Sequence, residues 1–566
     1  MFLPTTREEM KKLSWDRLDV IIVTGDTYID SPYIGAAVIG KVLHAAGYKV
    51  GIIAQPDINS KIDISRLGEP ALFWGVTAGS VDSMVANYTA LKKRRRKDDF
   101  TPGGKNTKRP DRATIVYSNL IRKYFKNTKP IILGGIEASL RRISHYDYWD
   151  DKIRRAILFD AKADILIYGM AEKSVLKLAR NLKTGKGWKD IRGICYISPH
   201  PKEEYTILPS CQEVKGYNKK FIAMFQAFYV NNDPITAKGL CQQQDSRYLI
   251  QNPPGYPLSQ KELDKVHDLS YEREVHPYYK KGGEVKALET IKFSITTHRG
   301  CYGECNFCSI TVHQGKVIQW RSENSILKEA KLLTRFKDFK GYILDVGGPT
   351  ANMYGIECQK KLKSGSCPGK RCLYPQICSS LKVNHKRQME ILKKIKQIEG
   401  VKKVFVASGI RYDMILYDQK YGEKYLRELV KYHISGQLKI APEHTENSVL
   451  EKMGKPDQGY LKKFRDKFLR INKEQKKKQF LTYYLIAAHP GCREEDMHKI
   501  KEYTSKELKL NPEQVQIFTP TPSAYSTLMY YTEIDPFTGK AIYVEKNLKK
   551  KKRQKEIVLE KRSKLQ

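Results

Sequence analysis

The sequence has no long hydrophobic run and comparatively little acidic charge. None of its apolar stretches approaches the roughly 20 residues that a membrane-spanning helix needs. The opening segment, MFLPTTREEMKKLSW, lacks the apolar centre of a secretory signal. We therefore expect a cytoplasmic protein with no membrane partner. Hydrophobic residues make up 40% of the 566, which is enough for the cores of roughly two to four domains.

The shortage of acidic residues leaves a strongly basic chain. Lysine and arginine number 102 against 62 aspartate and glutamate residues, for a net charge of +40. Such a field attracts polyanions, so a structured RNA is a candidate substrate. A lysine-rich, solvated surface explains the same composition equally well, because charge governs association and not chemistry.

A disulfide framework is not expected either. The chain has eleven cysteines, of which seven lie between residues 301 and 378. Reduced cysteines gathered in one part of a long chain without an export signal indicate a metal site.

The first 200 residues alternate apolar strands with helical segments. Strands are predicted at 18–23, 48–53, 71–76, 129–135 and 163–169, with a helix at 34–46. Strands buried on both faces and separated by helices predict a doubly wound parallel sheet. Residues 92–112 predict an exposed basic loop. Residues 201–286 are mostly polar and proline-rich, and predict a connector with some helix around 255–270.

A second α/β domain is predicted for residues 287–545. Strands are expected at 291–297, 342–346, 403–408, 438–442, 480–488 and 514–518. Six strand–helix units predict a partial (β/α)6 barrel whose chemistry lies at the carboxyl ends of the strands. The helices between them have apolar faces, one of Ile326, Ala330, Leu333 and Phe336 and one of Ile391, Ile395 and Ile398. Residues 546–566 form a basic tail, either helical or disordered.

The central motif is HRGCYGECNFCSI at 298–310. Cys301, Cys305 and Cys308 have the spacing C-x3-C-x2-C in a loop directly after a predicted strand. Thiolates are the usual ligands of iron–sulfur clusters. Three ligands leave one iron open, whereas a structural zinc or cluster normally takes four. A zinc site or unrelated cysteines are the alternatives.

This motif resembles the signature of the radical S-adenosylmethionine (SAM) superfamily, with Phe307 as the aromatic residue before the third cysteine. The resemblance implies that the three cysteines hold a [4Fe–4S] cluster whose open iron chelates SAM. It implies reductive cleavage of SAM to a 5′-deoxyadenosyl radical that takes hydrogen from a substrate. It also implies a low-potential electron donor of the flavodoxin or ferredoxin type.

Later segments fit the same superfamily in order along the chain. Gly347 and Gly348, in DVGGPT, resemble glycines whose backbone contacts the amino group of SAM. Ser408 and Arg411, in VASGIRYD, are expected to meet its ribose and carboxylate. Glu443, in APEHT, follows the fourth strand of the barrel with His444. Each of these residues alone is as readily explained as a turn or capping residue.

A second set of cysteines follows in ECQKKLKSGSCPGKRCLYPQIC. Cys358, Cys367, Cys372 and Cys378 lie within 21 residues, among glycines and prolines. Their spacing matches no simple zinc-ribbon pattern. A second iron–sulfur cluster, a zinc site and four unligated thiols all remain open, and His385 is a nearby candidate ligand.

Nearly the whole chain resembles the YgiQ-type radical SAM proteins, for example in GGIEASLRRISHYDYWDD (134–151) and FTPTPSAYSTLMYYT (518–532). The resemblance implies the cluster chemistry and does not imply a substrate. The first domain is similar in layout to the cobalamin-binding domains of some radical SAM proteins. The D-x-H-x-x-G motif whose histidine ligates cobalt is missing, which lowers this expectation without excluding it.

Several other residues are candidates with two readings. Asp26, Asp30, Glu137, His145 and Asp147 lie near predicted strand ends of the first domain, as pocket or as capping residues. Cys492 is expected to be an inert thiol. The sequence therefore predicts a radical SAM enzyme of unknown substrate. The alternatives are a cobalamin-dependent radical SAM methyltransferase and a non-catalytic, basic nucleic-acid-binding metalloprotein.

Overall fold

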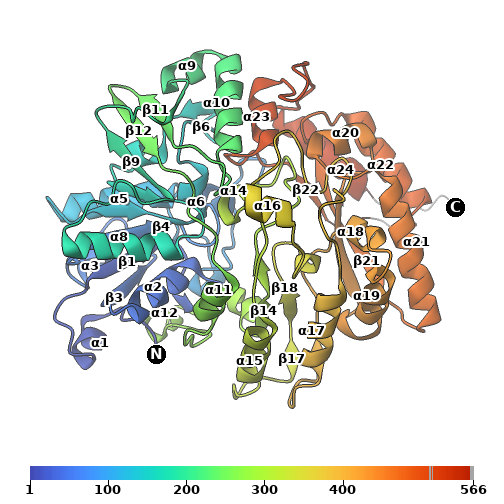
Figure 1. Ribbon diagram of the computed structural model, residues 1–566, viewed down its shortest axis with the longest axis horizontal. Coiled ribbons are helices and arrows are strands. Elements are labelled where there is room, and N and C mark those ends of the chain that lie inside the picture. Colours follow the sequence, from blue (N-terminus) through green and yellow to red (C-terminus); the bar gives the residue numbers. More distant parts are fainter. Residues whose placement is uncertain (509–511, 513, 561–566) are drawn as a thin grey trace. The chain divides into compact units, whose positions relative to one another are not determined.

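The computed structural model describes residues 1–508, 512 and 514–560 (Figure 1). The chain forms two compact units. The first comprises Met1–Lys292 and Val312–Gly315, and the second comprises Phe293–Thr311 and Lys316–Gln566. Within the described ranges, no helix has the length and apolar character needed to cross a bilayer.

The first unit is built on a nine-stranded sheet. Its parallel half has the order β3 (Val50–Ala54), β1 (Val20–Thr24), β4 (Phe73–Thr77), β5 (Ile131–Leu133) and β8 (Ile165–Ile167). Every residue of β1, β3, β5 and β8 is buried. The helices α2 (Gly35–Ala45), α5 (Ala113–Tyr124), α6 (Gly135–Leu140) and α8 (Glu172–Thr184) separate or flank these strands. The predicted doubly wound parallel sheet is confirmed.

The segment expected to be a connector contributes to the same sheet. The strands β9 (Ile194–Ser198), β12 (Arg247–Gln251) and β11 (Leu240–Gln244) extend it antiparallel from β8, and β10 (Thr206–Leu208) pairs parallel with β11. The expected boundary after residue 200 therefore cuts through one sheet. The strand pattern was hidden because β11 buries polar side chains. Gln242 and Gln244 are fully buried and hydrogen-bond Ser144.

Helices complete the remainder of the first unit. The expected helix near 255–270 is α11 (Gln260–His267), which begins with a capping box of Ser259 and Glu262. The other helices in this part are α9 (Cys211–Gly216), α10 (Asn218–Val230), α12 (Pro277–Lys280) and α13 (Lys286–Ile291).

Residues 92–112 are only partly the exposed loop that their composition predicts. The side chains of residues 93–97 are exposed, but Asp98, Thr101, Asn106 and Arg109 are buried. The loop folds back because Arg109 is drawn to two carboxylates, Asp26 and Asp98. We call residues 98–109 the cap segment.

The second unit has the expected succession of parallel strands. β14 (Ser294–Thr296) pairs with β18 (Asp345–Gly347), and β17 (Tyr342–Ile343) pairs with β19 (Lys403–Val404). A bridge from Ile410 to Ile440 leads to β20 (Gln437–Glu443), which continues through β21 (Phe480–Ala487) to β22 (Val515–Ile517). The chain thus forms six parallel segments in sequence order, as expected for the partial barrel.

Helices pack around these strands. They include α15 (Glu323–Leu333), α17 (Lys386–Lys396), α21 (Gly459–Glu474), α22 (Glu494–Lys506) and α24 (Leu548–Leu559). The predicted apolar faces are buried in one core at Ile326, Ala330, Leu333, Ile391 and Ile395. The tail was expected to be either helical or disordered, and its described part is helical. Helix α24 buries Ile557 and Val558 in the same core, and the rest of the tail, 561–566, lies outside the described residues.

Candidate active site

The loop that carries Cys301, Cys305 and Cys308 is closed at its base by a short hairpin. The chain enters through β15 (His298–Arg299) and leaves through β16 (Gln319–Trp320), which pair antiparallel. Three residues inside the loop, Gly300, Glu304 and Gly315, adopt positive backbone angles, with φ of 83°, 46° and 100°. These turns curl the loop back on itself.

The thiols of Cys301 and Cys305 converge on Gly303. A Cβ atom built on Gly303 would lie 3.2 Å from Cys301 Sγ and 3.5 Å from Cys305 Sγ. The same point is 3.5 Å from Arg411 Nη1. The Gly303 amide also donates a hydrogen bond to Cys301 Sγ at 3.3 Å. A side chain at this position would press on the Cys301 thiol, which would have to shift by a few tenths of an ångström.

The third cysteine belongs to the same electrostatic group. Burial and the neighbouring Cys305 raise the pKa of the Cys308 thiol to about 12, with smaller contributions from Cys301 and Glu443. Burial and Cys305 also raise the pKa of Cys301, whereas Arg411 opposes that rise. Three thiolates therefore need a cation or a metal to form together.

Arg411 supplies one such cation. Its Nη1 lies 3.7 Å from Cys305 Sγ, and its other guanidinium nitrogens bind Asp413 at 2.6 and 2.8 Å. The nearby carboxylate of Asp413 raises the pKa of Arg411 despite its burial. A fixed positive charge beside soft thiolate donors suits an iron–sulfur cluster, so these residues fit the expected group. In the described ranges, no three His, Cys, Asp or Glu side chains stand as ligands of a single metal ion.

The second strand end packs directly against the cysteine loop. A Cβ on Gly348 would lie only 2.6 Å from His298 Nε2. That nitrogen is 3.1 Å from the carbonyl oxygen of Thr350, whose hydroxyl lies 3.5 Å from Cys301 Sγ. Gly347 accepts a hydrogen bond from the Thr297 amide at 2.7 Å. The pair of glycines therefore permits close approach, and their contact with SAM remains a prediction.

The third strand end is organised by an aspartate that the sequence analysis did not single out. Asp345 accepts hydrogen bonds from the amides of Ala407 at 2.8 Å and Ser408 at 3.2 Å, and from the Ser408 hydroxyl. Asn352 was also missed, and its Oδ1 accepts the Arg411 amide at 2.8 Å. The signal for both was their position within or just after DVGGPT. The expected roles of Ser408 and Arg411 toward SAM stay predictions.

Glu443 ends the fourth strand in a strained conformation. Its φ is 69°, a value that residues other than glycine rarely adopt. The pairing of β20 with β21 also shifts register at this residue. Burial raises the pKa of its carboxyl group, while Lys455 and Arg411 oppose the rise. Backbone strain of this kind gathers at functional sites.

Two further side chains lie near this strand end. The ring of Phe307 meets His489 edge-on at 6.4 Å. Cys492 is fully buried, with its Sγ 3.5 Å from His444 Nε2, and burial raises the pKa of its thiol. These features are consistent with the inert thiol expected at Cys492, which stays a prediction.

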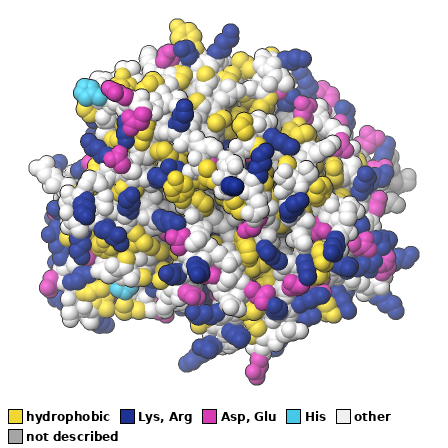
Figure 2. Space-filling view, viewed as in Figure 1, with side chains coloured by type: hydrophobic (Ala, Val, Ile, Leu, Met, Phe, Trp, Pro, Cys, Tyr) yellow, Lys and Arg dark blue, Asp and Glu magenta, His cyan; other side chains and the backbone are white. Residues whose placement is uncertain are grey.

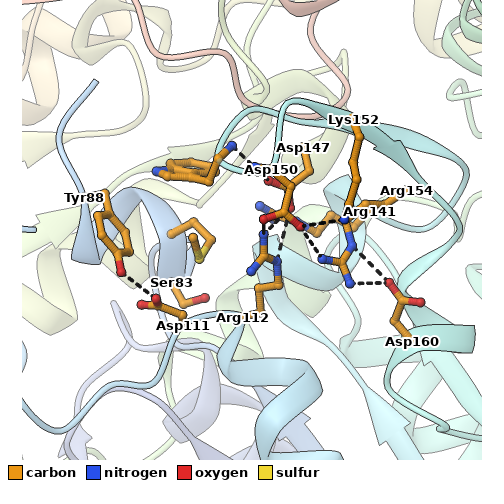
Figure 3. Close-up of polar contacts among 12 residues, drawn as sticks. Ser83, Tyr88, Asp111, Arg112, Arg141, Asp147, Asp150, Lys152, Arg154 and Asp160 are labelled. Atoms are coloured by element: carbon orange, nitrogen blue, oxygen red, sulfur yellow. Dashed lines mark hydrogen bonds and ion pairs between the residues drawn. The ribbon is translucent and has the colours of Figure 1, made fainter. Parts of the chain in front are cut away.

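The candidates of the first unit are held in structural pairs. Arg112 binds Asp147 at 3.0 Å and Asp150 at 2.9 Å, and Figure 3 shows these groups turned toward one another beside Arg141 and Arg154. Similar pairs fix the other candidates. Glu137 accepts from the amides of Ser83 at 2.8 Å and Thr114 at 3.0 Å, His145 Nδ1 lies 3.0 Å from the Ile143 carbonyl, and Asp30 binds Lys41 at 3.0 Å.

The cap segment fills the place where such a sheet binds ligands. The chain runs from β1 to β3 and then to β4 on the other side of β1, so the topological switch point lies between β1 and β4. Arg109, which is 1% exposed, donates there to Asp26 at 2.8 Å and to the Ala78 carbonyl at 2.7 Å. A Cβ on Gly79 would lie 2.2 Å from Asp26 Oδ1. These residues do not fit a cobalamin at the switch point.

Family models match both halves of the chain. Residues 2–294 match the Radical SAM N-terminal model, and residues 295–504 match the Radical SAM superfamily model. The chain is 61% identical over 562 residues to a UPF0313 protein of Fusobacterium nucleatum, covering 99% of each chain. It is 51% identical to a UPF0313 protein of Thermotoga neapolitana, covering 99% of this chain and 98% of the relative.

Solved structures share the fold at low sequence identity. The radical SAM methyltransferase TsrM from Kitasatospora setae, with cobalamin and a [4Fe–4S] cluster bound, gives a TM-score of 0.51 at 14% identity, covering 90% of this chain and 76% of that one. The cobalamin-dependent SAM radical enzyme OxsB gives 0.50 at 13% identity, covering 94% and 58%. The chain belongs to the UPF0313 (YgiQ-type) family of the radical SAM superfamily.

Proposed function

We propose that the second unit binds a [4Fe–4S] cluster through Cys301, Cys305 and Cys308, and that the chain cleaves SAM reductively at this site. One observation carries the proposal: the thiols of Cys301 and Cys305 and the Arg411 guanidinium all lie within 3.5 Å of the point where a Cβ atom of Gly303 would stand. When bound, the cluster supplies the electron that cleaves SAM.

The chain's own residues hold and orient the reactants. Arg411 offsets the negative charge of the thiolates, and Asp413 fixes its guanidinium. We expect the backbone of Gly347 and Gly348 to bind the amino group of SAM, and the Glu443 carboxylate to bind its polar atoms. Phe307 provides an apolar wall beside the third cysteine.

The experiment is anaerobic reconstitution with iron and sulfide, followed by dithionite, SAM and an assay for 5′-deoxyadenosine. We expect the product from the wild type and none from a variant with Cys301→Ala, Cys305→Ala and Cys308→Ala. Cys492→Ser is the matched control, because it removes a buried thiol outside the triad. A wild type that binds iron and sulfide but never cleaves SAM would refute the proposal.

Cobalamin-dependent methyl transfer is the less favoured reading of the same fold. The printed names of TsrM and OxsB describe cobalamin enzymes, but Arg109 and Asp26 occupy the switch point in this chain. We expect no spectral change when cobalamin is titrated into the protein. Stoichiometric binding at micromolar concentration would restore the methyltransferase reading.

The substrate is proposed to be a structured RNA. The net charge of +40 supports this proposal, and Lys and Arg side chains are spread across the visible face in Figure 2. Binding to tRNA is expected to weaken steeply with salt, because phosphate contacts release counterions. Binding that does not depend on salt concentration, or no binding at all, rejects an RNA substrate.

The reductant is proposed to be a flavodoxin or a ferredoxin.

A further inference from the structure

The second set of cysteines lies in a compact loop of the second unit. Cys358 is buried and caps α16 (Gln359–Ser364), and the chain then returns through a turn at Gly365. The Cys378 amide donates to the Cys372 carbonyl at 2.9 Å, which places these two residues at the base of one short turn. Three of the four cysteines are therefore positioned by regular hydrogen bonds.

The same three thiols are electrostatic neighbours. Burial raises the pKa of Cys372 to about 11. Lys361 opposes that rise, whereas Glu304 and, more weakly, Cys358 and Cys378 add to it. Cys358 and Cys378 therefore lie near enough to Cys372 for their charges to act on its thiol. The thiolate is the form in which a cysteine binds a metal.

Donors and cations stand ready for thiolates at this loop. Lys361, which is 3% exposed, places its Nζ 3.7 Å from Cys372 Sγ. The Ser380 amide and hydroxyl and the Leu381 amide hydrogen-bond the Cys378 thiol and lower its pKa. Residues 357–382 carry six lysine or arginine residues and one glutamate. This local charge offsets an anionic centre.

The loop also shares a small apolar cluster with the first cysteine motif. Its buried members are Tyr302, Ile318, Met353, Ile356, Cys358, Leu373, Leu381 and Met414. Cys301 and Cys372 both pack against it. In addition, Lys361 binds Glu304 at 3.3 Å, and the Cys358 amide meets the Tyr302 hydroxyl at 3.4 Å. An apolar lining excludes water, which protects iron–sulfur clusters and tunes their potential.

We propose that Cys358, Cys372 and Cys378 are ligands of a second iron–sulfur cluster, with Cys367 as the fourth thiol of the loop. A cluster spreads its thiolates more widely than a single ion does. His385 is not a ligand, because its nitrogens face Asp418 at 2.8 Å and Asn352 at 3.1 Å.

The test counts iron and sulfide after anaerobic reconstitution of the full chain. The wild type is expected to hold about eight irons, or two [4Fe–4S] clusters. Cys301→Ala, Cys305→Ala and Cys308→Ala together should leave about four, with the visible absorption of a cluster. Cys358→Ser, Cys372→Ser and Cys378→Ser together should also leave about four, and all six substitutions none.

A chain without the first triad that holds no iron and sulfide, or holds only zinc, overturns the proposal, as does a wild type with about four irons. Because the wild-type count needs no substitution, a variant that fails to fold cannot obscure the result. Cys211→Ser, a buried cysteine of α9, is the matched control and should leave the count unchanged. The readout does not involve SAM, so failure of SAM cleavage and failure of this site are distinguishable.

Discussion

Replacing Arg109 with methionine is expected to destabilise the first unit by about 3–5 kcal/mol. The guanidinium is fully buried and holds two carboxylates, Asp26 at 2.8 Å and Asp98 at 3.1 Å. Methionine preserves most of the volume but leaves both aspartates without their cation. Burial already raises the pKa of Asp26 against the pull of Arg109, so the loss falls on a carboxylate that is costly to ionise.

Urea unfolding followed by tryptophan fluorescence measures this effect. Four of the five tryptophans lie in the first unit, namely Trp15, Trp74, Trp149 and Trp188. With a slope of about 2–3 kcal/mol per molar urea, the midpoint should fall by about 1–2 M.

The triple variant Asp26→Asn, Asp98→Asn, Arg109→Met is the control for this argument. It removes the charges together, so it should recover much of the lost stability. If Arg109→Met unfolds at the wild-type midpoint, or if the triple variant is no more stable than the single one, the reasoning about the buried charges is wrong.

Three further predictions concern other parts of the chain. Burial lowers the pKa of His145 from 6.5 to about 4. The buried neutral imidazole therefore contributes fully to the free energy of unfolding above pH 6.5, and this contribution is lost as the pH falls to 4. That loss is on the order of 3 kcal/mol, and His145→Asn should flatten the decline in urea midpoint. Gly348→Ala should cost about 1–3 kcal/mol in thermal unfolding, because its Cβ meets His298, whereas Gly409→Ala has open space and should be neutral. Arg411→Lys should lower the rate of 5′-deoxyadenosine formation about tenfold with the iron count unchanged, since lysine makes no bidentate pair; loss of iron instead would assign Arg411 to holding the cluster loop.

Periodicity was sufficient to predict the buried parallel strands and the apolar helix faces. Every residue of β1 is buried, and Ile326, Ala330 and Leu333 share one side of α15 in the core. It failed for β11, whose sequence LCQQQ has the composition of a loop. Hydrogen bonds to Ser144 offset the free-energy cost of burying the amides of Gln242 and Gln244. No local sequence pattern indicates these tertiary bonds.

The site was predictable where ligands follow each other closely and less so where partners are distant. The spacing of the cysteine triad is local, so the convergence of Cys301 and Cys305 follows from one short loop. Asp345 binds Ser408 across 63 residues, and Arg109 binds Asp26 across 83. A basic stretch carries no sign of which residue will turn inward, because that choice depends on carboxylates far away in the sequence.

The cap segment also bears on the order in which the chain matures. All the partners of the Arg109 guanidinium, namely Asp26, Ala78 and Asp98, lie within the first 112 residues. Synthesis runs from the amino terminus, and domains fold as units while it proceeds. The network can therefore close before the first cysteine motif has been translated. Iron–sulfur clusters would then be assembled on a protein in which the Arg109 network has already formed. Iron starvation should therefore leave that network intact while the cysteine loops stay without clusters.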